Sequence, residues 1–221
     1  MRPITCNQTM LRVCEIFSSI QGESTFAGRL CTFVRLSGCN LRCTWCDTAY
    51  SREEAGREMS IEQILSEVGT YEVDLVEITG GEPLLQPETP RLCERLLQKG
   101  YEVLVETNGT QDIGLLPSGV RRIIDVKCPG SGAADSFLTS NIEKIGSGDE
   151  VKFVLSSLDD ARWAEDFITG NELGKRCTVI FSPVVGMLEP GLLADWMVKE
   201  RVEARLGLQL HKLIWGDARG V

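Results

Sequence analysis

Three cysteines stand close together in the first quarter of the chain: Cys39, Cys43 and Cys46 are spaced C-x3-C-x2-C. Thiolates gathered in one short loop are ligands that suit a soft metal centre. A 4Fe-4S cluster held entirely by protein takes four cysteines, so three would leave one iron open. An open coordination position is typical of a catalytic metal centre rather than a structural one. The loop therefore predicts a catalytic iron–sulfur cluster.

A glycine-rich turn, Gly80-Gly81-Glu82-Pro83, follows an apolar run and forms a second chemical signal. Two glycines let the backbone approach a ligand and present its N–H and C=O groups. Alone, such a segment is also an ordinary tight turn. Together with the cysteine loop, in which Trp45 precedes the last cysteine, it resembles the radical S-adenosylmethionine (SAM) superfamily. In that superfamily the backbone of the turn receives the amino group of SAM.

Other metal centres are alternatives for the cysteine loop. Structural zinc sites usually combine two separated pairs of Cys or His, whereas this chain has a single histidine, His211. Asp47 or Cys31 could supply a fourth ligand and complete an electron-transfer cluster. A plain iron–sulfur or zinc module would leave the Gly-Gly-Glu-Pro turn unexplained.

Further polar segments adjoin predicted strands. Gln21-Gly22-Glu23 precedes the cysteine loop, and Arg35 lies among apolar residues, where an arginine usually pairs with an anion. Glu106-Thr107-Asn108-Gly109 suits the amide-like edge of a heterocycle, although Asn-Gly is also a turn sequence. Asp125-Val126-Lys127 ends another strand with a charged pair. His211 follows the last predicted strand, where it is either a site residue or a packed one.

An alternation of strands and helices must position these residues. Apolar runs predict strands at 11–20, 30–36, 75–79, 102–106, 122–126, 151–155, 177–181 and 206–210. Helices are predicted from a capping box at Ser60 and Gln63, and at 88–99, 159–168 and 189–205. Residues 1–9 suggest a loose start, and 51–58 an exposed charged loop.

This order of elements favours βαβ units with a parallel sheet and right-handed crossovers. The six or so strands of the alternation are too few for a closed eight-stranded barrel. We therefore predict an α/β fold, a partial (β/α) barrel with a mostly parallel sheet, as a single domain over 1–221. The site is expected at the C-terminal ends of the strands, where the motifs fall.

Composition limits the classes of function. The net charge of −9 disfavours a nucleic-acid partner, because phosphate binding needs a basic face. No run is long enough to span a membrane and the start lacks a signal-peptide layout, so a cytoplasmic location is expected. Nine cysteines without an export signal indicate reduced thiols. Most cysteines outside the loop lie in apolar runs and should be buried, whereas Cys128, beside Lys127, is the one with a possible role.

Longer segments resemble one family, the 7-carboxy-7-deazaguanine synthases of queuosine and deazapurine biosynthesis. The similarity covers nearly the whole chain and rests on the segments at 15–23, 33–35, 39–48, 79–84, 106–110, 211–216 and 219–221. Two departures are Ser24, where the family often has glycine, and residues 125–129, where many members carry a Ser-Pro-Lys-Pro-type loop.

The resemblance implies a radical SAM lyase acting on 6-carboxy-5,6,7,8-tetrahydropterin. A 5′-deoxyadenosyl radical would abstract the C6 hydrogen, the ring would contract with help from Mg2+, and ammonia would leave. It also implies a homodimer and an electron donor such as flavodoxin or ferredoxin. The product would serve queuosine formation in tRNA or another deazapurine pathway.

The resemblance and the motifs together assign site residues. The cluster would be held by Cys39, Cys43 and Cys46, and Mg2+ by Thr48. SAM would contact Trp45, Cys46, Asp47, Gly81, Glu82, Asp125, Val126, Lys127, Phe181, Ser182 and Pro183. The substrate would contact Ile20, Gln21, Gly22, Arg35, Thr79, Glu106, Asn108, His211 and the carboxylate of Val221. No residue is expected to act as an acid or base, since the radical comes from SAM.

A glycyl-radical-enzyme activase is a second hypothesis, because such enzymes share the cysteine spacing but act on a protein. The Gln-Gly-Glu segment and the C-terminal Trp-Gly and Arg-Gly-Val sequences argue against it. The iron–sulfur or zinc module is the third, non-enzymatic hypothesis.

Overall fold

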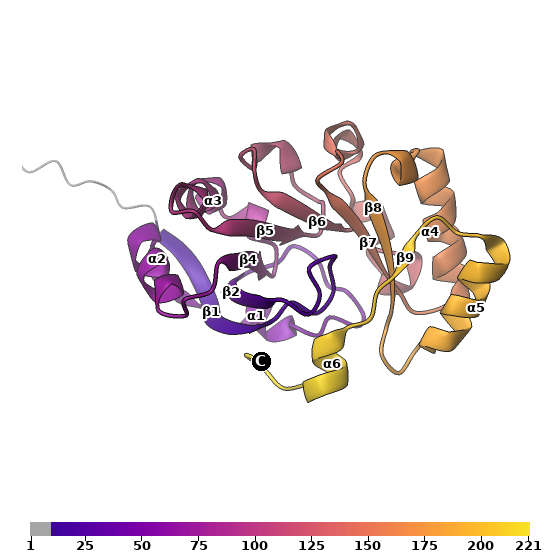
Figure 1. Cartoon of the computed structure of the whole chain (residues 1–221), viewed down its shortest axis with the longest axis horizontal. Helices are drawn as coiled ribbons and strands as arrows, with labels where there is room; N and C mark the ends of the chain where they lie inside the picture. Colours follow the sequence, from indigo (N-terminus) through magenta and orange to yellow (C-terminus); the bar gives the residue numbers. More distant parts are fainter. Residues whose placement is uncertain (1–9) are drawn as a thin grey trace, which may run out of the picture.

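The structure is a computed structural model that describes residues 10–221, so the loose start predicted at 1–9 lies outside the described residues. The described chain forms one sheet in the order β3-β1-β2-β4-β5-β6-β7-β8-β9 (Figure 1). Its strands are β1 (Met10–Ile20), β2 (Leu30–Leu36), β3 (Arg57–Ser60), β4 (Leu75–Gly80), β5 (Glu102–Thr107), β6 (Arg121–Asp125), β7 (Glu150–Leu155), β8 (Thr178–Pro183) and β9 (Arg205–Leu206).

Most of the sheet is parallel. Every neighbouring pair from β2 and β4 through β8 and β9 is parallel, whereas β1 is antiparallel to both β2 and β3. The short connection between β1 and β2 allows a hairpin but not a crossover. Within the described residues β3 and β9 are free edges, so the sheet stays open. The predicted partial barrel with a mostly parallel sheet is confirmed.

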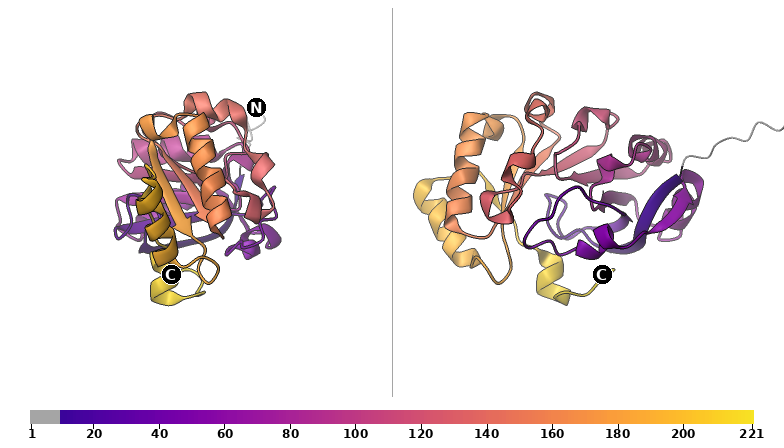
Figure 2. Two further views of the ribbon diagram at one scale, coloured as in Figure 1. Left: turned by 90° about the vertical axis from the view of Figure 1, so that its right-hand side faces the viewer. Right: turned by 180° about the vertical axis from the view of Figure 1, so that it is seen from behind.

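Helices cover the outer face of this sheet, as the turned views in Figure 2 show. The helices on this face are α2 (Ile61–Gly69), α3 (Thr89–Gln98), α4 (Leu158–Gly170) and α5 (Pro190–Glu200). The two short helices α1 (Ala49–Glu53) and α6 (Leu210–Trp215) do not belong to this layer. Short 3-10 turns lie at Pro83–Leu85, Ile113–Leu115, Pro129–Ser131, Ala134–Ser136, Thr139–Lys144 and Leu173–Lys175. The capping box of Ser60 and Gln63 starts α2 as predicted. No helix among residues 10–221 has the length and apolarity needed to cross a membrane.

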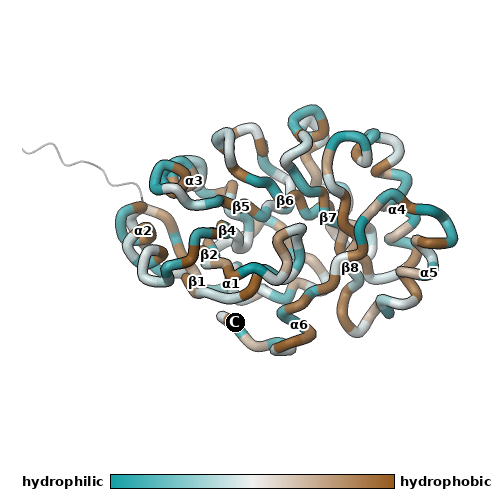
Figure 3. Tube along the Cα trace, viewed as in Figure 1, coloured by the Kyte–Doolittle hydropathy of each residue, from teal (hydrophilic) through white to brown (hydrophobic). Residues whose placement is uncertain are grey.

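The two faces of the sheet differ in chemistry, because successive side chains of a strand point to opposite sides. Val76 and Ile78 of β4 lie in the main core under the helices. Leu75 faces the other way and belongs to a small inner cluster with Cys31, Leu104 and Ile123. Figure 3 shows hydrophobic, brown stretches along strands such as β1 and β8, with teal ones on outer turns. Farther along the inner face, towards the carboxyl ends, the buried side chains become charged.

Three predicted segments differ from the structure. The segment 51–58 was expected to be an exposed loop, but it contains the end of α1 and the start of β3, and Ser51 is buried. Its charged residues Arg57 and Glu58 are exposed on an edge strand that pairs with β1, where charge prevents further strand pairing. Charge here reflects an edge strand and not a loop.

The helix and the strand predicted near the C-terminus are both longer than the observed ones. The helix predicted to reach 205 ends at Glu200, because Arg201 turns into the left-handed conformation. The strand predicted at 206–210 is only the two-residue β9, since Gly207 donates to the Phe181 carbonyl and the chain then turns into α6. The other predicted strands and helices agree within one or two residues.

Candidate active site

A cavity of about 650 Å³ opens at the carboxyl ends of the strands, between the cysteine loop and the C-terminal segment. Most residues predicted for the site line it. These are Ile20, Gln21, Gly22, Arg35, Cys39, Cys43, Trp45, Cys46, Asp47, Thr48, Thr79, Gly81, Glu106, Asn108, Asp125, Lys127, His211 and Val221. One cavity thus brings together motifs from both ends of the chain.

Five predicted residues do not line the cavity. Val126 and Phe181 belong to the main core, and Ser182 and Pro183 are buried within β8. Glu82 is also buried; it accepts hydrogen bonds from Asn108 N, Thr107 Oγ1 and Leu84 N. Burial raises the pKa of Glu82 although these hydrogen bonds oppose the shift. Its carboxyl therefore organises the end of β5 from behind the cavity wall.

Backbone contacts join the cysteine loop to the Gly-Gly turn. Gly38 starts the loop at φ +96° and donates to the Ser51 carbonyl, while its own carbonyl accepts from Glu82 N. Gly81 N donates to Ser51 Oγ. A Cβ at Gly81 would lie 1.8 Å from the Gly38 carbonyl oxygen, so only glycine fits there. The two motifs are therefore held as one unit.

The three loop thiols fit the predicted cluster. All eight described cysteines are free, and those of the loop line the cavity. Burial raises the pKa of Cys43, and nearby Lys127 opposes the rise. Such a cation favours a thiolate ligand. Cys31, weighed as a fourth ligand, is instead buried in the inner apolar cluster.

The cysteines outside the loop behave as core residues or as partners of neighbouring side chains. Cys93 and Cys128 are buried in the main core, and burial raises the pKa of both thiols. Cys128 was singled out for a possible role, but its side chain packs among apolar groups. Cys6 lies outside the described residues.

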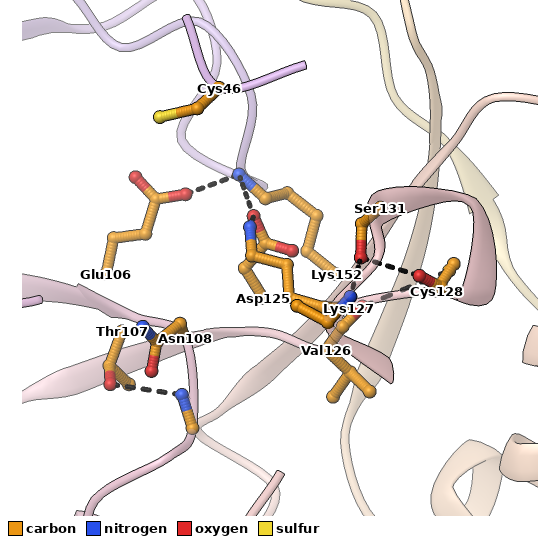
Figure 4. Close-up of polar contacts among 12 residues, drawn as sticks. Cys46, Glu106, Thr107, Asn108, Asp125, Val126, Lys127, Cys128, Ser131 and Lys152 are labelled. Carbon is orange, nitrogen blue, oxygen red and sulfur yellow. Dashed lines mark hydrogen bonds and ion pairs between the residues drawn. The ribbon is translucent and has the colours of Figure 1, made fainter. Parts of the chain in front are cut away.

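A charged layer in the cavity wall centres on Lys152, which the sequence interpretation missed. Lys152 of β7 is buried and forms ion pairs with Glu23 and Glu106, as Figure 4 shows for Glu106. Asp125 lies 3.8 Å from the same ammonium and 2.8 Å from that of Lys127. Burial opposes charge on Lys152, but the surrounding carboxylates raise its pKa. A lysine inside the apolar run 151–155 was the available signal.

Glu77 of β4 is a second buried titratable group that was missed. Burial and, next, the nearby Glu106 carboxylate raise the pKa of Glu77 to about 8, which favours the protonated carboxyl. Glu77 Oε2 accepts from Gln21 Nε2 at 3.1 Å, and Gln21 Oε1 accepts from the backbone of Glu23 and Ser24. This chain of hydrogen bonds fixes the 21–24 turn and directs Glu23 towards Lys152.

Arg35 is oriented from outside the cavity. Its Nε donates to Glu15 Oε1 at 2.8 Å, and the Tyr50 hydroxyl donates to the same oxygen at 2.8 Å. Within residues 10–221 its two Nη groups have no hydrogen bond to another side chain. The guanidinium can therefore bind an anionic ligand with these groups.

Two places could hold a divalent cation. Thr48 lines the cavity, with Oγ1 3.9 Å from Cys46 Sγ. Glu23, Asp47 and His211 place three ligand atoms within 4.8 Å of one another. Although partial burial opposes it, the proximity of His211 and Lys212 lowers the pKa of Asp47 to about 2. A hydroxyl suits Mg2+, whereas two carboxylates and an imidazole suit a transition metal better.

Comparisons with known proteins agree with this arrangement. Residues 33–128 match the model of the radical SAM superfamily. A 7-carboxy-7-deazaguanine synthase from Chlorobaculum tepidum is 45% identical over 215 residues, which cover 96% of this chain and 97% of that protein. One from Koribacter versatilis is 43% identical over 96% of this chain and all of that protein. The crystal structure of QueE from Escherichia coli matches in fold, with a TM-score of 0.74 at 22% identity over 90% of this chain and 94% of that one.

Proposed function

The chain belongs to the 7-carboxy-7-deazaguanine synthase family of radical SAM enzymes, and we propose that it converts 6-carboxy-5,6,7,8-tetrahydropterin to 7-carboxy-7-deazaguanine with loss of ammonia. The observation that carries the proposal is the shared cavity, in which the three loop thiols, the Gly-Gly turn and Arg35 meet. Its volume lies in the usual range for sites that bind small ligands and cofactors. The activase and the non-enzymatic module explain neither the near-complete length of the match nor this combination.

The cluster is proposed to be held by Cys39, Cys43 and Cys46, with SAM at the open iron. When bound, the reduced cluster and SAM supply the 5′-deoxyadenosyl radical that removes the C6 hydrogen. This chain's own contribution is to place SAM: the Gly80-Gly81 backbone is held open by its contact with Gly38. Asp125 and Lys127 form a charged pair on the same wall.

The substrate is an anion with a flat amide edge, and the cavity offers a partner for each part. Arg35 suits the carboxylate because its Nη groups are available. Glu106, Thr79 and Asn108 offer donors and acceptors for the heterocycle edge. Thr79 Oγ1 already donates to Glu106 Oε2 at 3.2 Å, which orients that carboxylate.

The mouth of the cavity is proposed to be completed by Thr48, His211 and the chain end. Thr48 would supply the protein oxygen for Mg2+, which usually keeps water or substrate for its other positions. His211 is held close to Glu23, with Nε2 3.7 Å from Glu23 Oε1. Val221 lines the cavity, so its carboxylate would meet the substrate, and the segment before it would shield the radical from water.

The wider setting follows from the family. The protein would work in the cytoplasm as a homodimer, receive electrons from a flavodoxin or ferredoxin, and make a precursor for queuosine in tRNA or another deazapurine. The net charge of −9 gives no support to direct binding of nucleic acid.

The first experiment is an anaerobic assay with reconstituted cluster, SAM, Mg2+, a strong reductant and 6-carboxytetrahydropterin. We expect 7-carboxy-7-deazaguanine, detected by mass, and none from the Cys43→Ala variant. Cleavage of SAM without deazapurine would retain the radical SAM chemistry and point to another substrate. Absence of SAM cleavage by protein with an intact cluster would refute the proposal.

A further inference from the structure

Arg219, two residues before the chain end, has contacts that the proposed reaction does not require. Its Nη1 and Nη2 donate to the two oxygens of Glu54 at 2.7 and 2.8 Å, and its Nε donates to Glu15 at 3.0 Å. The guanidinium also lies 3.9 Å from the centroid of the Tyr50 ring. Bidentate pairing and stacking together fix an arginine more firmly than either contact alone.

The neighbours of Arg219 make no comparable contact. Asp217 pairs with Lys212 and Ala218 N donates to the Trp215 carbonyl, so both remain within the C-terminal segment. Among the described residues, Arg219 is the only member of 216–221 with hydrogen bonds to β1 or to the end of α1. Arg219 therefore anchors the C-terminal segment, residues 216–221, to β1 and to the end of α1.

The fastening point lies close to the chain end in space as well as in sequence. The Cα atoms of Arg219 and Val221 can be at most about 7 Å apart, so the chain end must stay near Arg219. Both residues line the cavity, and Figures 1 and 2 show the C-terminus beside α1. Fixing Arg219 therefore limits where the carboxylate can go.

One carboxylate connects this contact to the cavity wall. Glu15 accepts from Arg219 through Oε2 and from Arg35 and Tyr50 through Oε1. Hydrogen bonds from all three groups outweigh burial and keep the pKa of Glu15 below its usual value. The residue that orients Arg35 is thus also a partner of Arg219.

From these contacts we propose that Arg219 is a positioning residue: by binding Glu54, Glu15 and the Tyr50 ring it holds the Val221 carboxylate over the cavity, ready to meet the substrate. This inference rests on the proposed function, because that function gives the carboxylate its ligand. Arg219 itself need not touch the substrate.

The test compares Arg219→Gln and Glu54→Gln with a matched control. Glu54 does not line the cavity, so its substitution removes the bidentate contact with Arg219 and leaves the cavity lining unchanged. Arg57→Gln is the control, because Arg57 and Glu67 form an exposed Arg–Glu pair at 3.1 Å on β3 and α2. Arg219→Lys tests geometry, since an ammonium keeps the charge but cannot bridge two carboxylates in the same way.

The first readout does not depend on catalysis: the rate at which a carboxypeptidase releases Val221 from the cluster-loaded protein with SAM. When release of the C-terminal segment is fast relative to cleavage, the cleavage rate follows the fraction of molecules in which the segment is released. We expect release to be about tenfold faster in Arg219→Gln, several-fold faster in Glu54→Gln, intermediate in Arg219→Lys, and unchanged in Arg57→Gln. Wild-type release rates in both Arg219→Gln and Glu54→Gln would overturn the proposal.

The second readout is the KM for the pterin. If the C-terminal segment is released in nine molecules out of ten, KM should rise about tenfold, because only the molecules with the segment in place bind the pterin well. The value of kcat should change less. SAM cleavage without substrate should match the wild type. Faster release with an unchanged KM would overturn the positioning role while the synthase function stands. A wild type that makes no deazapurine would refute the proposed function, whatever the protease shows.

Discussion

The outer and inner faces of the sheet are buried to a similar degree but by opposite means. On the outer face Val76, Ile78 and Phe153 pack under helices. On the inner face, next to them in sequence, Glu77 and Lys152 are equally buried yet charged or titratable. Apolar burial stabilises the fold directly, whereas buried charges need each other to offset lost hydration. The comparison implies that the apolar side chains of the outer face contribute stability at any pH. The contribution of Glu77 and Lys152 on the inner face depends on their protonation.

The largest effects should come from the neighbours Phe153 and Lys152. Phe153→Ala should lower the free energy of unfolding by about 3–5 kcal/mol at any pH, because it leaves a cavity in the core. Lys152→Met should cost a similar amount, about 3–5 kcal/mol, near pH 7, because Glu23 and Glu106 lose their buried cation.

The pH dependence separates these two variants. Lys152 lowers the pKa of Glu106 against the effect of burial, so in the wild type this pair stabilises the fold above the ordinary glutamate pKa. In Lys152→Met the Glu106 carboxyl should take up a proton on folding, and the deficit should shrink as pH falls from 7 to 5. Urea unfolding of reduced protein at both pH values is the measurement. A pH-independent deficit in Lys152→Met would show that the inner face behaves like the outer one.

Glu77→Gln should have the next largest effect, with the opposite sign. Because burial raises the pKa of Glu77, folding favours its protonated form, and that stability is lost as pH rises from about 4.5 towards about 8. The glutamine variant cannot titrate, so its stability relative to the wild type should rise by a few kcal/mol between pH 5 and pH 8. Unfolding midpoints across this range test the claim. A parallel pH profile for the two proteins would contradict the assignment of a neutral carboxyl.

The adjacent pair Ile78 and Thr79 sharpens the contrast between stability and activity. Ile78→Val should lower the free energy of unfolding by about 1 kcal/mol and leave turnover unchanged. Thr79→Val keeps the shape but removes the hydroxyl that donates to Glu106, so substrate affinity should fall several-fold. Chemical denaturation and steady-state kinetics on both variants provide the check. Equal effects of both changes on KM would remove the distinction between the faces at this strand end.

The smallest effect on stability should come from Thr48→Ala at the mouth of the cavity. Thr48 has no side-chain cap hydrogen bond to α1, so the unfolding free energy should change by less than about 0.5 kcal/mol. Its proposed role predicts a weaker response of turnover to Mg2+. An unchanged Mg2+ titration would remove Thr48 as the cation ligand.

The sequence was sufficient for the outer face but not for the inner one. Runs of apolar residues and a capping box predicted β4, α2 and β7, because local hydrophobic patterns indicate which residues are buried. They could not show that Glu77 and Lys152 face a common interior, since the Lys152–Glu23 contact joins residues 129 positions apart. The position of 181–183 at a strand end was also not enough to predict which of these side chains face the cavity. It did not reveal that the Phe181 side chain points into the core.

The C-terminal contact shows the same limit. The resemblance pointed to Val221, but no local pattern relates Arg219 to Glu54, which lies 165 positions earlier. The motifs of the cysteine loop and the Gly-Gly turn were easier to interpret, because their chemistry is contained in a few consecutive residues.

The contact between Gly38 and Gly81 holds the cysteine loop in place without using its sulfurs. Gly38 N donates to the Ser51 carbonyl, Gly81 N to Ser51 Oγ and Thr44 N to the Ser131 carbonyl, so these anchors use backbone groups and one hydroxyl. Support of the loop and the supply of metal ligands are therefore assigned to different atoms of the same short segment.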